Sequence, residues 1–380
     1  MITSITAQQT TRNMLSQIEQ NNTTLQTLRQ TAEAEKLENR TGIYLDNPEV
    51  EFNYLWGNPT SIGDRRDIRV TQSFDIPTIT GMKNRMASEQ NKLVDIRYKA
   101  DRINILLEAW QNLVELAYYN CLLSEWQLRL DHARTLASAY QKLFDEGETN
   151  ILEYNKIQLN LSTAEGEMAR MQVERQAVLS ELKRLNGGEE LLIDSLYTQE
   201  EILPLSFEEW YSAVEQQNPV LQYVNREIEL AKKQIAINKA QGLPSFSAGY
   251  MREKVVGEAY QGLTLGVSIP LWENKNRVKQ ARTALKAAEI RREDTRIQFY
   301  NRLQSQYERA YGLQTAAKGY RQALVNLNNV ELLKKALDAG QISLLEYMME
   351  ISIYYDTVNQ ALEAERDFGL AFAELSAVLL

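Results

Sequence analysis

Two acidic residues occupy equivalent places in a repeated stretch, and their chemistry could serve a function. The stretch has the form Gly-x-x-x-x-Leu-Glu-Tyr and occurs as GETNILEY from Gly147 and as GQISLLEY from Gly340. The carboxylates of Glu153 and Glu346 could attract cations and repel anions. They could equally stabilise the first turn of a helix by ~0.3–1 kcal/mol through the helix dipole. Both interpretations stay open from the residues alone.

Other side chains with reactive chemistry are scarce. The chain has one histidine, His132, and one cysteine, Cys121, so we expect no internal disulfide and no cysteine-based zinc site. We interpret both as packed helix residues. Met348 and Met349 could contact a soft metal, but adjacent helix residues point about 100° apart, so we expect no metal site. The sequence has no P-loop, dinucleotide fingerprint or catalytic triad, and we expect neither enzyme activity nor a cofactor.

The composition narrows the class of protein. The chain of 380 residues is 44% hydrophobic and 24% charged, with a net charge of −9 and a mean hydropathy of −0.43. No apolar run approaches the roughly 20 residues that a membrane-spanning helix needs. Basic residues are scattered among acidic ones, so no nucleic-acid partner is expected. The opening MITSITAQQTT lacks the features of a signal peptide, so either the protein is not exported or its signal is missing from this sequence.

The repeated stretch belongs to a wider internal duplication. Its two copies lie 193 residues apart, close to half of the 380-residue chain. Asn22 matches Asn218 at the similar offset of 196. Matches that stay nearly in register over a long distance indicate a structural repeat. We therefore predict a first repeat over residues 1–190, a linker or equatorial segment over 191–217 and a second repeat over 218–380.

Each predicted repeat begins with a helix and two strands. Apolar residues recur at helical spacing over 22–39 and over 218–241. The period then changes to two, which is typical of a strand with one apolar face. Polar, turn-rich segments at 56–67 and 252–262 predict the loops between the strands of each pair. The residues expected on the apolar face are Val50, Phe52, Tyr54, Val70, Phe74, Ile76, Phe246, Tyr250, Leu263, Leu265 and Val267.

A pair of long helices completes each predicted repeat. Apolar positions spaced alternately by 4 and 3 run over 96–121 and over 157–185, which is the 3.5-residue repeat of coiled coils. The segment 81–146 predicts one helix of ~95 Å at 1.5 Å per residue. We expect each helix to pack on two sides because a second apolar line follows the first, consisting of Leu106, Leu113 and Leu116.

The glycines of the repeated stretches predict the tips of two antiparallel helical hairpins. Gly147 and Gly340 interrupt the helical pattern at points where a tight turn needs a left-handed residue. Short strand pairs are not stable alone, and hairpins of this length cannot bury two faces within one chain. We therefore expect an oligomer in which strands of several copies close a barrel and the helices form a tube.

With this order of elements the chain resembles the TolC family of outer-membrane channels, the exit ducts of tripartite efflux pumps and type I secretion systems. The resemblance covers essentially the whole chain. It depends on the duplicated plan, the two tips, GLPSFSAGY before the second strand pair and VSIPLW at its end. It implies a mainly α fold with a small β part, assembled as a homotrimer with a twelve-stranded β-barrel and a twelve-helix α-barrel. It also implies a location in the outer membrane, extending into the periplasm.

The resemblance gives the tips and the strands a role. In relatives, carboxylates near the tips line the constricted periplasmic mouth, which implies a gate formed by Glu346, Glu153 and Glu350. Three copies of each would form an anionic ring that favours cations. The family docks a periplasmic adaptor, or membrane fusion protein, at its tips, which implies contacts at Gly147, Leu152, Gly340 and Leu345. The apolar face of the strands would contact outer-membrane lipid.

Two classes of function follow from these observations. One is a passive outer-membrane conduit that docks a periplasmic adaptor and an inner-membrane transporter. The alternative is a soluble periplasmic coiled-coil adaptor or structural protein. Such adaptors typically have one hairpin flanked by lipoyl-like and β-barrel modules. Two hairpins, together with strands that have a lipid-like face, favour the conduit.

Overall fold

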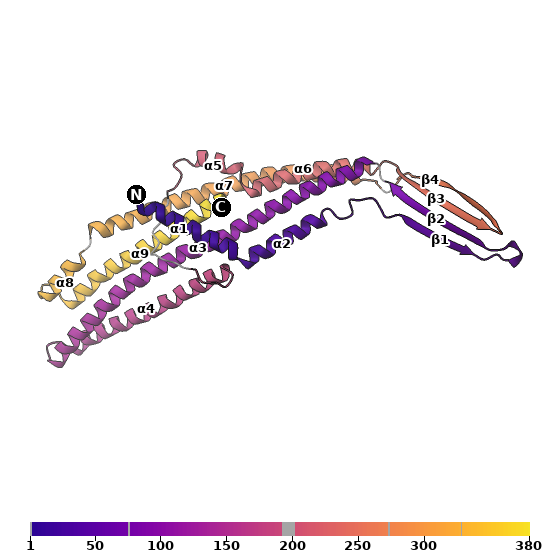
Figure 1. The fold of residues 1–380 in the computed structure, drawn as a ribbon. Helices are drawn as coiled ribbons and strands as arrows, with labels where there is room; N and C mark the ends of the chain where they lie inside the picture. Colours follow the sequence, from indigo (N-terminus) through magenta and orange to yellow (C-terminus); the bar gives the residue numbers. More distant parts are fainter. Residues whose placement is uncertain (1, 75–76, 192–201, 273, 328) are drawn as a thin grey trace. The chain divides into compact units, whose positions relative to one another are not determined.

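The computed structural model describes residues 2–74, 77–191, 202–272, 274–327 and 329–380. The described chain is mainly helical with one β-sheet, as predicted (Figure 1). Its helices are α1 (Ile2–Asn21), α2 (Thr23–Glu38), α3 (Pro77–Asp145), α4 (Ile151–Leu185), α5 (Phe207–Glu215), α6 (Pro219–Ala240), α7 (Arg277–Asn326), α8 (Val330–Asp338) and α9 (Leu344–Ser376). Its strands are β1 (Glu49–Leu55), β2 (Arg65–Phe74), β3 (Ser245–Val255) and β4 (Glu258–Ser268), with short 3-10 turns at Thr60–Ile62 and Ala377–Leu379.

The chain divides into two compact units, each built from separate segments. Unit 1 consists of Met1–Thr27, Asp101–Val214 and Tyr300–Leu380, and unit 2 consists of Leu28–Ala100 and Glu215–Phe299. Each unit therefore draws on both halves of the sequence. The division into repeats along the sequence stays a proposal, and residues 192–201 of the expected linker lie outside the described residues.

Unit 2 contains an antiparallel sheet with the strand order β1-β2-β3-β4. The two predicted strand pairs therefore join through β2 and β3. Residues directly opposite each other across a ladder share a face of the sheet, and one such row is Val50, Val70, Tyr250 and Leu263. The register places every predicted apolar position of the described strands on this face, and each of those side chains is at least 38% exposed in one chain. Ile76 lies outside the described residues.

The strands are longer than predicted. The expected loop over 252–262 is wrong, because β3 and β4 continue through it and only Val256 and Gly257 form the turn, with φ of 46° and 90°. A two-residue turn with positive φ matches the twist of a hairpin. The expected loop over 56–67 is too long at its end, since β2 begins at Arg65. Charged residues fit there because Arg65 pairs with Asp67 on the opposite, polar face at 3.0 Å.

Unit 1 contains the helical hairpin formed by the later part of α3 and by α4. Helix α3 has 69 residues and confirms the predicted uninterrupted helix. The buried residues of α4 include Ile157, Ala164 and Met171, which belong to its predicted apolar line. On α3 the second line is the more buried one, with Leu106 2% and Leu116 2% exposed. Apart from Ile96, which is 8% exposed, the first line over 96–121 is half-buried within the chain, so α3 has apolar surface on two sides.

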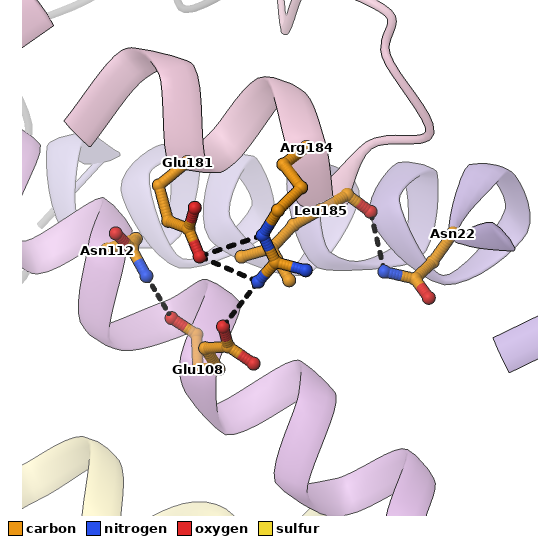
Figure 2. Close-up of polar contacts among 6 residues, drawn as sticks. All are labelled: Asn22, Glu108, Asn112, Glu181, Arg184 and Leu185. Carbon is orange, nitrogen blue, oxygen red and sulfur yellow. Dashed lines mark hydrogen bonds and ion pairs between the residues drawn. The ribbon is translucent and has the colours of Figure 1, made fainter. Parts of the chain in front are cut away.

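Polar side chains fix the C-terminal end of α4 (Figure 2). Arg184 donates to Glu181 one turn earlier and to Glu108 of α3, both at 2.6 Å. The buried Asn22 donates its Nδ2 to the Leu185 carbonyl at 2.7 Å, and its Oδ1 accepts the Leu25 N–H at 2.8 Å. The last carbonyls of a helix lack partners within the helix. Asn22 therefore caps the start of α2 and at the same time donates a hydrogen bond to a carbonyl at the end of α4.

The second hairpin differs from the prediction in one respect. We expected two long helices, but the helix leading to Gly340 is divided, since α7 ends at Asn326 and α8 begins at Val330. Asn326 and Asn329 flank the division, while residue 328 lies outside the described residues. Asparagine has a lower helix propensity than most other residues, so this stretch favours an interruption of the helix, although the Asn329 side chain makes no capping hydrogen bond.

Candidate functional site at the two helical tips

Both tips close through the same backbone turn, at the predicted glycines. Gly147 and Gly340 have φ of 75° and 65°. The N–H of the next residue returns to the carbonyl five positions earlier, from Glu148 to Leu143 and from Gln341 to Ala336, each at 2.8 Å. A left-handed glycine with this hydrogen bond is a common way to end a helix. The repeated stretch therefore encodes the turn of a hairpin.

Glu346 takes part in capping α9. Its Oε2 accepts the N–H and the hydroxyl of Ser343, both at 2.8 Å. Its own N–H donates to Ser343 Oγ at 3.3 Å, which completes a capping box. The hydrogen bonds from the Ser343 backbone and side chain hold the pKa of Glu346 below its usual value. The carboxylate is therefore ionised and exposed, and it has a structural partner within its own turn.

Glu153 occupies the same position on α4 but is held differently. The start of α4 is capped by Asn150, whose Oδ1 accepts the N–H groups of Leu152 at 2.9 Å and of Glu153 at 3.0 Å. The Glu153 carboxylate is half-buried and accepts the Thr149 hydroxyl at 2.7 Å. The third gate candidate, Glu350, is exposed one turn after Glu346 on α9.

An apolar cluster joins the first turns of the two hairpins. Ala137 of α3, Ile157 of α4 and Leu344 of α9 form its buried part, and Met348 packs against it. Met348 is thus part of a small core, whereas Met349 is 52% exposed. The cluster keeps the starts of α4 and α9, and so the turns that contain Glu153 and Glu346, on neighbouring elements.

The expected docking residues present apolar surface at the tips. Leu152 is 70% exposed and Leu345 is 53% exposed. Each stands directly before the glutamate of its repeated stretch. An added Cβ at Gly147 or Gly340 would meet no atom within 4 Å, so both turns are open on their outer side. The tips therefore offer exposed leucines beside carboxylates.

A contact that sequence reasoning missed lies behind the second tip. His132 is packed, as predicted, but its ring also joins α3 to two tyrosines of α9. Its Nε2 lies 2.7 Å from the Tyr347 hydroxyl oxygen, and its Nδ1 lies 3.1 Å from the Tyr355 hydroxyl oxygen. Tyr347 is 1% exposed, and burial raises its pKa to about 12. The one sequence feature that could have pointed to this contact is Tyr347, the tyrosine that ends the repeated stretch.

A buried arginine lies next to this contact. Arg129 is 5% exposed, and its guanidinium stacks on the rings of Trp126 and Tyr355, with Cζ 4.8 and 4.5 Å from the ring centroids. It also donates to the Tyr355 carbonyl at 3.2 Å. Burial lowers the pKa of Arg129. The stacking and this hydrogen bond hold the cation between α3 and α9.

Other candidate chemistry is structural. Cys121 is half-buried, and burial raises the pKa of its thiol, which keeps it protonated and unreactive. Among the residues that the structure describes, no group of three or more His, Cys, Asp or Glu side chains could hold a metal ion. None of the helices in the described part of the chain is both long and apolar enough to cross a membrane.

A charged groove in unit 2 has its charges largely paired. The groove has a volume of about 620 Å³ between α3, α6 and α7. Lys92 and Arg226 on its wall contact the buried Glu89 at 3.0 and 3.4 Å, and Lys232 contacts Glu229 at 2.8 Å. The contact of Arg226 with Glu89 joins α6 to α3, whereas the other two pairs lie within one helix each. The tips therefore remain the main candidate site.

Comparisons with known proteins agree with this geometry. No family model matches the chain. The alkaline protease secretion protein AprF of Pseudomonas aeruginosa is 20% identical over 367 residues, covering 86% of this chain and 75% of AprF. The open-state MtrE outer membrane channel of Neisseria gonorrhoeae has a TM-score of 0.79 at 13% identity, over 97% of this chain and 88% of that chain. The outer membrane protein VceC of Vibrio cholerae has a TM-score of 0.76 at 13% identity, over 97% and 96%. The chain therefore has the fold of the TolC-like outer-membrane efflux channels.

Proposed function

We propose that the protein is the outer-membrane channel of a tripartite efflux or type I secretion system. It acts as a passive exit duct for substrates that an inner-membrane pump delivers. The strongest support comes from the sheet. Exposed apolar residues such as Phe52, Leu263 and Leu265 lie together on one of its two faces. A membrane-crossing barrel needs an apolar outer face and a polar inner one. A soluble periplasmic adaptor, the alternative, would leave this face in water.

The proposed assembly is a homotrimer. Within one chain β1 and β4 are the edges of the sheet, and unpaired edges are unstable in a membrane. Pairing β4 of one copy with β1 of the next would close a twelve-stranded barrel. The helices would form the matching α-barrel, which is supported by an exposed line on α4 with heptad spacing. Its members are Leu152, Leu159 and Val173, which are 70%, 69% and 68% exposed. Such exposure is expected in a single chain for apolar positions that pack against a helix of another copy in a coiled coil.

The tips would close the channel and dock its partners. Three copies of Glu346, with Glu153 and Glu350 nearby, would place an anionic ring at the periplasmic mouth. A ring of this kind favours cations over anions. The exposed Leu152 and Leu345 would contact a periplasmic adaptor, which in turn joins the channel to an inner-membrane transporter. The strands would lie in the outer membrane, with the helices extending into the periplasm.

One matched pair of variants tests this proposal. Leu265→Arg places a charge on the apolar face, whereas Thr264→Arg places the same charge on the opposite face. An arginine that faces lipid costs about 2–4 kcal/mol near the membrane centre. We expect the wild type and Thr264→Arg to fractionate with the outer membrane and to have the mass of three 43.7 kDa chains in detergent. Leu265→Arg should lose both properties. A wild-type protein that is a monodisperse monomer with ordered strands in water contradicts the proposal.

A further inference from the structure

The contact between His132 and α9 has a consequence that does not depend on the channel proposal. His132 is the only histidine of the chain, and histidine is the side chain whose ordinary pKa lies near neutral pH. Its ring contacts the hydroxyls of Tyr347 and Tyr355 through opposite nitrogens, at 2.7 and 3.1 Å. It also meets the Tyr347 ring edge to face, with centroids 5.8 Å apart. Both tyrosines belong to the first half of α9.

Charged groups from three helices surround this contact. Helix α8 contributes Lys334, whose charge acts on His132. The groups on α3 and α9 that act on Arg129 or on the tyrosines include carboxylates and the guanidinium itself. They are Glu125 and Arg129 of α3, and Asp356 of α9, together with Asp338 at the end of α8. A proton on His132 would therefore add a third cation beside Arg129 and Lys334.

The hydrogen bonds fit a neutral ring. A neutral imidazole has one donor and one acceptor nitrogen, so one tyrosine hydroxyl can donate to it while the other accepts from it. A protonated imidazole donates from both nitrogens, and the hydroxyl that had donated loses its acceptor. Tyr347 is 1% exposed and Tyr355 is half-buried, so whichever hydroxyl had donated could not turn freely to water for a replacement while α9 stays packed.

The direction of the pH effect follows from the surroundings. Burial, and then the charge of Lys334, lower the pKa of His132 below its ordinary value of 6.5. The packed state therefore binds the proton less readily than a state in which α9 has moved away. Packing is fully stable above pH 6.5 and weakens as the pH falls through the pKa of the packed state. Each unit by which the pKa is lowered changes the ratio of the two states about tenfold.

We infer that His132 is an acid-released latch. Its neutral ring holds the first turns of α9 against α3, and its protonated ring lets them separate. The moving part begins at the second tip and includes Tyr347 and Tyr355. The first tip has no equivalent, because the hydroxyl of Tyr154 donates to Gln141, which does not titrate, at 2.6 Å.

Two measurements on the full-length protein in detergent test the latch. Because the chain has one histidine, selective labelling gives a single histidine NMR signal, and we expect it to titrate below 6.5. Hydrogen exchange, corrected for the intrinsic effect of pH, should rise in residues 344–355 as the pH falls through that value. Exchange in residues 151–157 of the first tip should stay unchanged. Titration at or above 6.5, or a flat exchange profile in 344–355, overturns the inference.

A conservative variant separates the latch from general acid sensitivity. Glutamine at position 132 can donate one hydrogen bond and accept another without titrating. We expect His132→Gln to abolish the acid-dependent exchange in residues 344–355 while leaving exchange at neutral pH close to that of the wild type. Persistence of the acid response in His132→Gln would assign it to other groups. If this variant is unstable, the titration of the wild-type histidine still decides the question.

Discussion

The two tips have the same sequence pattern and the same turn, yet their tyrosines have different surroundings. Tyr154 is half-buried and stacks on Phe144 of its own hairpin, with ring centroids 4.9 Å apart. Tyr347 is 1% exposed and reaches His132 on the neighbouring hairpin. The repeated stretch thus determines where the chain turns, while the helices around it determine what the tip is attached to. Within the described part of the chain, the tyrosine of the second tip is the one that contacts a histidine, whereas the tyrosine of the first tip contacts the amide of Gln141.

The glutamates of the two tips also differ in their hydrogen-bond partners. At the second tip the carboxylate of Glu346 completes the cap with Ser343. At the first tip Asn150 caps the helix, and Glu153 contacts the hydroxyl of Thr149 instead. Among the three gate candidates, Glu346 therefore combines its proposed gate charge with a capping box. A glutamine can replace a glutamate in a capping box, so Glu346→Gln removes the charge and keeps the cap.

The largest expected difference between the tips concerns the tyrosines. Tyr347→Ala removes a fully buried ring, and we expect the free energy of unfolding to fall by ~3–5 kcal/mol. Tyr154→Ala removes a half-buried ring that is stacked on one neighbour, and we expect a loss of ~1–2 kcal/mol. Urea denaturation followed by circular dichroism compares the two. Equal losses would mean that the tips are attached alike, contrary to the structure.

The glycines should behave alike at both tips. Gly147→Ala and Gly340→Ala each force a side chain into left-handed backbone, at a cost of ~1–2 kcal/mol. An added Cβ has open space at both positions, so the backbone is the only source of the loss. Gly319 lies in helix α7, also with open space, and Gly319→Ala should raise stability by ~0.5–1 kcal/mol. Unequal losses at the two tips, or a loss in the control, would show that the turns are not equivalent.

Local patterns in the sequence predict the local structure of this chain. Gly147 and Gly340 are visible because a left-handed turn between helices favours glycine. The apolar faces of the strands are visible because side chains alternate between the two faces. The prediction of a loop over 252–262 was wrong. We had taken the polar composition of this segment to indicate a long loop, whereas the turn needs only Val256 and Gly257.

Contacts between distant segments were not predictable. The pairing of β2 with β3 joins residues such as Val70 and Tyr250, and no local pattern specifies that partnership. His132 and Tyr347 are 215 residues apart, and their meeting depends on how α3 and α9 pack. The assignment of Glu346 to a capping box needed the position of the Ser343 hydroxyl. The fold was thus accessible from the sequence, while the attachments of the tip were not.

The ion selectivity of single channels in planar bilayers tests the central claim most directly, namely that the protein is a channel whose mouth is formed by its tips. A salt gradient across the bilayer gives a reversal potential, and we expect the wild type to prefer cations. Glu346→Gln removes one charge from each copy without removing the cap, and it should reduce that preference and weaken block by multivalent cations. Glu153→Gln should have a smaller effect, because the carboxylate that it removes is half-buried. Unchanged selectivity and block in Glu346→Gln would leave Glu346 as a helix cap alone, and the absence of any channel in the wild type would contradict the proposed function.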